Sequence, residues 1–349
     1  MADFMYVALQ GDDKIVRFTL DPATGDLAPL GDIAVPGGPA PMVVDPAQRV
    51  LHVARRGECK LSSYRIDQRT GDLSPIGTVS LPTDPCYIAT DRRGRFVLSA
   101  YYEGRGIAVH PVGPDGAVAD PPVERRETAR GAHCFQTDPT NRFGFVPHIA
   151  GRGPNEIRQF RFDQETGHLT PNTPPKALPP GEVGPRHYCF HPSKDIVYFS
   201  NEQGCSVTAY RLDTSAGTLS ALQTVSTLPK GYKGQSSCAQ IRMTPSGRFL
   251  YAPNRGHNSI ASFAVDTATG LLTPTGHTPA EPVPPRLQPR PRRQVPLRRR
   301  AGVGPADRLS HRRCRATRTA QDVSRRHPAD VGLDHPAGRR PRPLSPIRS

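Results

Sequence analysis

The chain alternates short hydrophobic runs with turn-forming residues. The runs KLSSYRID, EIRQFRFD and SIASFAVD carry β-branched and aromatic residues at alternating positions, and Gly, Asp, Pro and Asn separate one run from the next. A period of two is typical of strands that bury one face. No part of the first 285 residues sustains the 3.6-residue hydrophobic period of an amphipathic helix. The pattern therefore predicts an all-β fold of many short strands with few helices.

Two signatures recur along these 285 residues. In the first, a strand runs into a turn with a glycine followed by Leu or Val, as in YRIDQRTGDL, and the six glycines are Gly25, Gly71, Gly116, Gly167, Gly217 and Gly270. The second, seen in TDRRGRFVLSA and TPSGRFLYAPN, is offset from the first. The glycines are 46, 45, 51, 50 and 53 residues apart, so each unit holds about four short strands, the content of one β-propeller blade. The repeats therefore predict six blades stacked around a central channel.

The composition changes abruptly after Pro285. Residues 286–349 contain 18 Arg and four Asp but no Lys, Phe, Tyr or Trp, so they carry +14 of the chain's net charge of +15, and residues 1–285 are nearly neutral. One interpretation is a disordered Arg/Pro-rich tail that binds RNA or an acidic partner. A selected basic arm ordinarily mixes Lys with Arg, whereas an all-Arg, Pro- and Ala-rich string is what GC-rich DNA encodes in an unintended frame.

A shift of one nucleotide supports the second explanation. Read one nucleotide later, codons for the tail permit AFSLDPDGKFLYAAGLGSGRLIAYRI and then LKTYPVGTRPMWVLITRL, and the first string repeats the blade signatures found upstream. The hypothesis is that a frameshift between Pro284 and Arg286 has replaced a seventh blade and the strand that would pair with MYVALQ. We therefore divide the chain into a propeller, residues 1–285, and a disordered tail, residues 286–349, and expect no nucleic-acid partner.

Several functional classes lack sequence support. No apolar run approaches 18 residues, so no membrane partner is expected. The start MADFMYVALQGDDK has no basic stretch followed by an apolar one, which predicts a cytoplasmic location. The seven cysteines are widely spaced without a CxxC pair, which favours reduced thiols over a disulfide framework or a metal site. No GxSxG elbow, P-loop or strand-to-helix GxGxxG is present.

Four ionisable residues occupy places where propeller loops converge on the channel. His133 in GAHCFQTDP and Arg186 in GPRHYCFHP precede a predicted inner strand, while Glu202 in FSNEQGCSV and Arg255 in APNRGHNSI follow a strand. Each of the four could instead have a purely structural role. A His can stabilise a turn, an Arg can donate to backbone carbonyls, and Asn-Glu and Asn-Arg pairs are common in turns at strand ends. Their convergence from different blades favours a catalytic or anion-binding site. The histidines His148, His187, His191 and His257 show no metal-ligand spacing, so no metal is expected.

The repeated strings DPxGRFLY, YRIDxxTGxL and NRGHNSI, with GPRHxxFHP and SNE in order, resemble the bacterial seven-bladed β-propeller lactonase family, which includes 6-phosphogluconolactonases and, more distantly, fungal 3-carboxymuconate lactonizing enzymes. The resemblance covers residues 4 to about 285. It implies a seven-bladed propeller of which six blades are recognisable here, and it implies a site of His, Arg, Glu and Arg that falls on His133, Arg186, Glu202 and Arg255. His187, Asn201 and His257 are expected to join Arg186 and Arg255 in binding the substrate.

These residues suit hydrolysis of a sugar-acid lactone. Two guanidinium groups bind phosphate or carboxylate and stabilise an oxyanion, and either Glu202 or His133 activates water. The first hypothesis is a monomeric 6-phosphogluconolactonase-like hydrolase without a cofactor, acting on a phosphorylated sugar lactone. The alternatives are a lactonizing enzyme (cycloisomerase), in which the same arginines bind carboxylates, and a non-catalytic propeller that serves as a binding platform.

Overall fold

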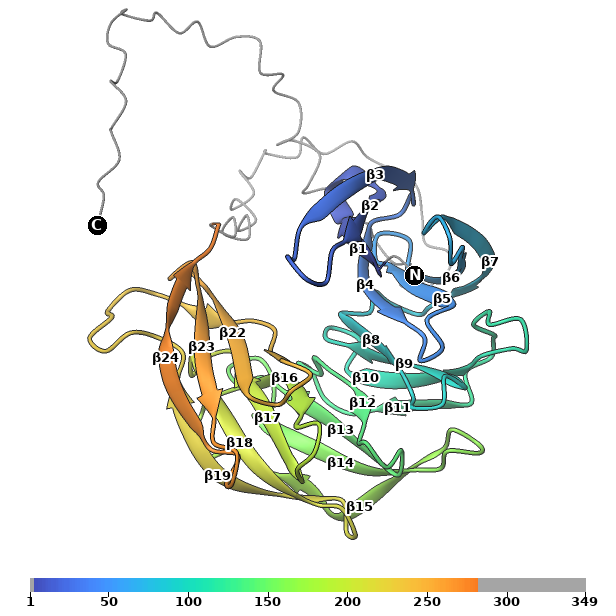
Figure 1. Cartoon of the computed structure of the whole chain (residues 1–349). Helices are drawn as coiled ribbons and strands as arrows, with labels where there is room; N and C mark the ends of the chain where they lie inside the picture. Colours follow the sequence, from blue (N-terminus) through green and yellow to red (C-terminus); the bar gives the residue numbers. More distant parts are fainter. Residues whose placement is uncertain (1–2, 282–349) are drawn as a thin grey trace, which may run out of the picture. The chain divides into compact units, whose positions relative to one another are not determined.

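The computed structural model describes residues 3–281, and these residues form six antiparallel β-sheets around a central channel (Figure 1). Each sheet consists of consecutive strands, so each is one propeller blade. Within residues 3–281 the helical content is one 3₁₀ turn, η1 (Gln10–Asp12). The all-β propeller with six blades is thus confirmed. The predicted tail, residues 286–349, lies outside the described residues.

Blade one contains three strands and blades two to four contain four each. Blade one is β1 (Asp3–Leu9), β2 (Lys14–Leu20) and β3 (Leu27–Ala34). Blade two is β4 (Pro39–Val44), β5 (Val50–Arg55), β6 (Lys60–Ile66) and β7 (Leu73–Ser80). Blade three is β8 (Tyr87–Thr90), β9 (Phe96–Tyr101), β10 (Gly106–Pro111) and β11 (Glu124–Glu127). Blade four is β12 (Gln136–Thr137), β13 (Phe143–His148), β14 (Glu156–Phe162) and β15 (Leu169–Ala177).

Blade six differs from blade five in its inner strand. Blade five is β16 (Pro185–Phe190), β17 (Ile196–Asn201), β18 (Ser206–Asp213) and β19 (Thr218–Ser226). Blade six is β20 (Ser237–Cys238), β21 (Arg242–Met243), β22 (Phe249–Arg255), β23 (Ser259–Val265) and β24 (Leu272–Pro279). Both β20 and β21 pair with β22, so together they form one interrupted inner strand.

The glycine signature forms the turn between the third and fourth strands of a blade. In blade two, the Asp67 carboxylate accepts hydrogen bonds from the backbone N–H groups of Arg69 and Thr70, and the N–H of Gly71 donates to the carbonyl of Asp67 at 2.8 Å. Gly71 has φ +70°, a conformation that favours glycine. This local chemistry explains why an aspartate and a glycine four residues later repeat along the chain.

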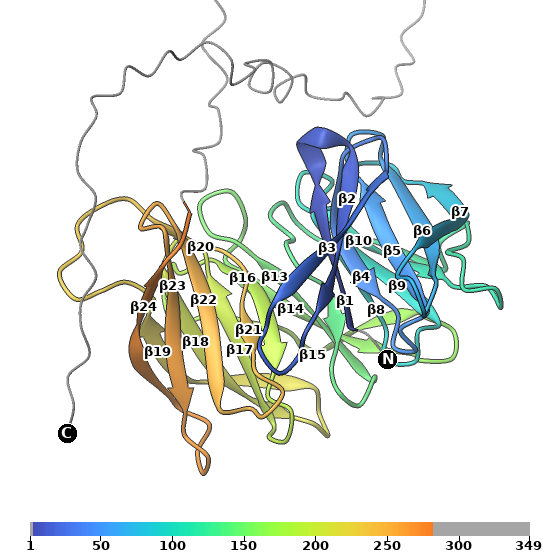
Figure 2. The same cartoon turned by 45° about the horizontal axis from the view of Figure 1, so that its top comes forward.

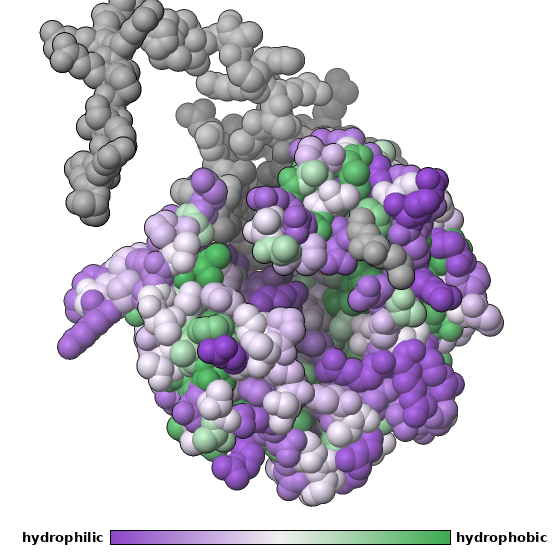
Figure 3. Space-filling view, in the orientation of Figure 1, coloured by the Kyte–Doolittle hydropathy of each residue, from purple (hydrophilic) through white to green (hydrophobic). Residues whose placement is uncertain are grey.

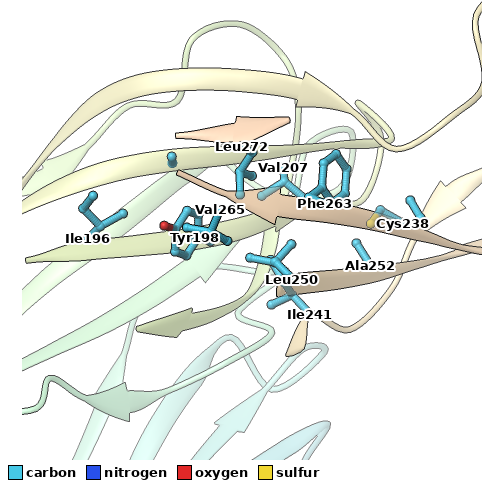
Figure 4. Packing of buried hydrophobic residues seen from close by; sticks show 12 residues of the cluster. Ile196, Tyr198, Val207, Cys238, Ile241, Leu250, Ala252, Phe263, Val265 and Leu272 are labelled. Carbon is cyan, nitrogen blue, oxygen red and sulfur yellow. The ribbon is translucent and has the colours of Figure 1, made fainter. Parts of the chain in front are cut away.

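Apolar side chains pack between neighbouring blades in five clusters, one for each pair of consecutive blades. Figure 4 shows the cluster between blades five and six, in which Tyr198 and Val207 meet Leu250 and Phe263. No cluster joins blade one to blade six within residues 3–281. Accordingly the six blades form an open arc rather than a closed ring (Figures 1 and 2).

The two end blades are incomplete in different ways. β1 pairs with β2 on one edge only within residues 3–281, so blade one lacks the fourth, inner strand that blades two to five possess. In blades three to five the second strand is buried at every position, whereas β22 in blade six alternates, and Phe249 and Tyr251 are each 38% exposed. Within residues 3–281, blade one therefore lacks an inner strand and blade six leaves one face partly exposed.

Candidate active site

The topology sends the repeat turns and the candidate residues to opposite ends of the blades. Because consecutive strands are antiparallel, the turn after the first strand and the turn after the third strand share one end. The turn after the second strand, and the connection into the next blade's inner strand, share the other end. Glu202 follows the second strand of blade five, and Arg186 begins the inner strand of the same blade. The site residues therefore lie at the end of the blades opposite to the repeated Asp–Gly turns.

Glu202 lies between two arginines. Its Oε2 accepts a hydrogen bond from Arg186 Nε at 3.1 Å, and its Oε1 accepts one from Arg255 Nη2 at 2.6 Å. Arg255 also donates to the carbonyl of Cys238 at 3.3 Å. The side chains of Arg186 and Glu202 are 11% and 17% exposed, so little solvent screens the pairs. One carboxylate serves two guanidinium groups, which leaves a net positive charge at this point.

Both arginines keep donors available for a ligand. Arg186 Nη1 and Arg255 Nε are buried and make no hydrogen bond within residues 3–281. Burial lowers the pKa of Arg186, and the neighbouring Glu202 carboxylate opposes that effect. A buried donor without a partner is costly, so such groups are commonly satisfied by a bound ligand or water. The arrangement can hold an anion or a developing oxyanion.

Two histidines lie beside this ion-pair cluster. His133 Nδ1 and His187 Nε2 are 3.3 Å apart and share a hydrogen bond whose donor depends on the tautomers. Their rings contact Tyr102 and Tyr87 respectively in edge-to-face arrangements. Burial, together with the nearby Arg186 and His133, lowers the pKa of His187 well below its usual value. His187 is therefore neutral at pH 7, and its Nε2 can accept a hydrogen bond from the Nδ1–H of His133 in one pair of tautomers.

The structure brings five of the seven predicted residues together. His133, Arg186, His187, Glu202 and Arg255, here called the mouth cluster, all lie at one end of the channel. Asn201 is fully buried inside blade five, where its amide donates to the hydroxyls of Ser206 and Thr208. His257 lies in the turn of blade six against Ser259, at 2.6 Å, and beside the Tyr232 ring. Neither makes a hydrogen bond or ring contact with the mouth cluster within residues 3–281.

Two further side chains near the mouth cluster, Tyr102 and Arg56, were not predicted from the sequence. Tyr102 follows the second strand of blade three, and Arg56 follows that of blade two, at the same offset as Glu202 in blade five. Burial and the nearby Glu202 carboxylate raise the pKa of Tyr102, so its phenol remains a hydrogen-bond donor. An alignment of the segments VARRGE, SAYYEG, FSNEQG and APNRGH would have placed all four side chains on one level.

A cavity of about 860 Å³ opens along the central channel. His187 and Cys86 line it, as do Tyr6 of β1 and Gln10 of η1. Figure 3 shows the surface hollowed between the blades at this place. The volume is within the usual range of small-molecule sites.

Other chemistries find little support in residues 3–281. No group of three or more His, Cys, Asp or Glu side chains is arranged to hold a metal ion. Burial raises the pKa of Cys86 to about 12 and of Cys134 to about 11, which disfavours a thiolate nucleophile. Within residues 3–281 the thiols of Cys86, Cys134, Cys189, Cys205 and Cys238 are free. No helix in this part of the chain is long and apolar enough to cross a bilayer.

Comparisons with known proteins identify the family. A curated protein named 6-phosphogluconolactonase from Pectobacterium carotovorum is 36% identical over 284 residues, which cover 81% of this chain and 83% of the relative. Its namesake from Yersinia pestis is 32% identical over the same length and with the same coverage.

Solved structures agree. A periplasmic gluconolactonase from Pseudomonas aeruginosa has a TM-score of 0.72 at 26% identity, with 80% of this chain and 84% of that one covered. A putative 6-phosphogluconolactonase from Bacteroides fragilis has a TM-score of 0.70 at 25% identity, with coverage of 81% and 83%. The family described as lactonase, 7-bladed beta-propeller, matches residues 5–288. With this match over most of the described propeller, the chain belongs to the seven-bladed β-propeller lactonase family.

Proposed function

We propose that the protein hydrolyses 6-phosphoglucono-δ-lactone to 6-phosphogluconate. The relatives named 6-phosphogluconolactonase support this choice of substrate. The observation that carries the proposal is the carboxylate of Glu202 held between Arg186 and Arg255, each of which keeps a buried, unpartnered N–H donor. Anionic lactones present the charge and the carbonyl oxygen that such donors bind.

In the proposed reaction, a water molecule attacks the lactone carbonyl carbon. The carbonyl oxygen becomes an oxyanion, which the free donors of Arg186 and Arg255 stabilise. Collapse of the tetrahedral intermediate breaks the ring ester bond, and the ring oxygen takes up a proton to become a hydroxyl. The product is the open-chain hydroxy acid, which contains the elements of one added water and releases a proton to become the carboxylate at neutral pH.

We infer that His133 is the general base. Both oxygens of Glu202 already accept hydrogen bonds from guanidinium groups, which fits a role in positioning the arginines. His133 carries an imidazole, the side chain that most often transfers protons near neutral pH, and its ring is oriented by the hydrogen bond that it shares with His187.

The test compares lactone hydrolysis by the wild-type chain and by Glu202→Gln. Freshly prepared 6-phosphoglucono-δ-lactone should disappear faster with wild-type protein than spontaneously, and Glu202→Gln should lower kcat/KM about 100-fold because both arginines lose their anchor. Glu165→Gln is the matched control, since Glu165 is an exposed ion-pair partner of Arg93 and Arg95 on the outer surface.

Two results would count against the proposal. No acceleration over spontaneous hydrolysis would exclude this lactone as the substrate and leave the lactonizing and scaffold readings. Equal rates for Glu202→Gln and Glu165→Gln would place the chemistry away from the mouth cluster.

A further inference from the structure

Arg56 occupies in blade two the place that Glu202 occupies in blade five. Each follows the last residue of the second strand, and each donates its backbone N–H to a glycine carbonyl just before the inner strand, Arg56 to Gly38 at 3.0 Å and Glu202 to Gly184 at 2.7 Å. Because blades repeat around one channel, equivalent positions lie at the same level. Arg56 therefore reaches the same end of the channel as the mouth cluster.

The Arg56 guanidinium is held in place but is not fully satisfied. Its Nη2 donates to the carboxylate of Asp84, which precedes the inner strand of blade three. Its Nε is buried and makes no hydrogen bond within residues 3–281. An arginine that is fixed on one side, with a buried donor remaining, is organised in advance to bind an anion.

Arg56 reaches the cavity from blade two, three blades away from the Arg186 of blade five. It lines the 860 Å³ cavity together with Cys86 and His187. Both Arg56 and Arg186 act electrostatically on the Cys86 thiol and lower its pKa, although burial has the larger, opposite effect. The two guanidinium groups therefore both lie near Cys86.

The wall of this cavity favours negative ligands. Besides Arg56, Arg92 and Arg242 line it, and none of its lining residues is an aspartate or glutamate. Arg92 is already committed to the carbonyls of Thr137 and Asp138, beyond the far end of the inner strands. Arg242 lies within the inner strand β21, so Arg56 is the one cavity arginine of the three that follows a second strand, as Glu202 does.

We propose that Arg56 binds the phosphate of the lactone and thereby selects a phosphorylated substrate over the unphosphorylated sugar lactone. This proposal rests on the proposed function. It gives the two ends of the substrate to different blades: the carbonyl to Arg186 and Arg255, and the phosphate to Arg56. It also addresses a question that the relatives leave open, because they include proteins named for either lactone.

The test is substrate selectivity in Arg56→Gln. For 6-phosphoglucono-δ-lactone we expect KM to rise at least tenfold with kcat changed less than about threefold, while kcat/KM for glucono-δ-lactone stays the same. Arg49→Gln is the control for charge. It removes an exposed arginine from the opposite end of blade two and should change kcat/KM for neither lactone. Arg56→Lys keeps the charge and should recover part of the selectivity.

A binding measurement separates this proposal from the proposed function. By calorimetry, 6-phosphogluconate should bind the wild-type chain more tightly than gluconate, and Arg56→Gln should remove that difference. Wild-type protein that hydrolyses neither lactone would overturn the proposed function, whereas the binding preference would still test the phosphate site. Equal losses for both lactones in Arg56→Gln, or retained selectivity in a variant with a wild-type melting temperature, would overturn the role of Arg56.

Discussion

On the hypothesis that the reading frame is shifted after Pro285, restoring the frame should stabilise the protein. The perturbation is a change of one nucleotide that replaces residues 286–349 by the blade-like strings of the alternative frame. In the described structure the faces that such a blade would cover are partly exposed: Phe249 and Tyr251 in blade six by 38% each, and Leu27 and Leu30 in blade one by 44% and 37%. Covering them removes apolar surface from water.

The size of the effect follows from these exposed fractions. With roughly 200 Å² for each aromatic side chain, a 38% exposed fraction leaves about 75 Å² to be covered, or about 2 kcal/mol per side chain at ~25 cal/mol per Å². The two leucines add about 1 kcal/mol each. A total of about 6 kcal/mol is an upper figure, since unfolded chains already bury some surface, and it corresponds to a Tm increase of about 10 °C or more.

The assay is thermal unfolding of three proteins by calorimetry: the chain as given, the frame-restored chain, and a chain ending at Pro285. The third protein is the control that separates gain of a blade from loss of the arginine-rich segment. We expect the restored chain to melt at least 10 °C above the other two. If all three proteins melt together, the reasoning from the open faces is refuted. If resequencing confirms every base of the gene and an intact upstream frame, the frameshift hypothesis is refuted.

Two further predictions concern stability. Burial lowers the pKa of both His52 and His148 to about 4, against 6.5 in an unfolded chain, so the unfolded state takes up protons first as the pH falls from 6.5 toward 4. Stability should fall across that window by up to about 3 kcal/mol per histidine; His52→Gln should flatten the slope of urea midpoints between pH 7 and pH 5, and identical wild-type midpoints would contradict this. Gly217→Ala should destabilise far more than Gly25→Ala, although both glycines have positive φ, because an added Cβ meets the Phe143 ring in the first case and open space in the second. Urea denaturation measures the difference, and equal losses would show that backbone strain alone decides.

The parts of the fold that were readable from the sequence are those set by local chemistry. Turns built on an aspartate carboxylate and a left-handed glycine, such as Asp67 to Gly71, need particular residues at a fixed spacing, and the repeat was visible for that reason. The three-strand content of blade one was not readable from β1 itself, because β1 has the same alternation as any second strand. It was anticipated only through the hypothesis that the strand that would pair with MYVALQ has been replaced after Pro285.

The candidate site was readable only in part, for a related reason. The turns that follow second strands end on a left-handed residue that is not glycine, as at Cys59, Arg105 and Cys205. No repeated residue type therefore marks these turns in the sequence, and a charged residue there stands out only by its type, as Glu202 does. Asn201 seemed equivalent in kind, yet strand alternation turns it into the blade, where two hydroxyls take its amide hydrogens. Arg56 was not predicted because it is adjacent to Arg55, and residue type alone does not tell which of the two faces the channel. In the structure Arg55 pairs with Glu58 instead.

The position of Arg255 gives the open arc a kinetic consequence. Arg255 ends β22 in the terminal described blade, which is packed on one side only, while Arg186 and Glu202 sit in a blade packed on both sides. Blades with fewer neighbours open locally at lower free energy than the molecule as a whole. Amide hydrogens of β22 and β23 should then exchange earlier than those of β17, and heat should inactivate the protein before it unfolds it. The ion pair between Arg255 and Glu202 would then break while Arg186 and Glu202 in blade five are still folded.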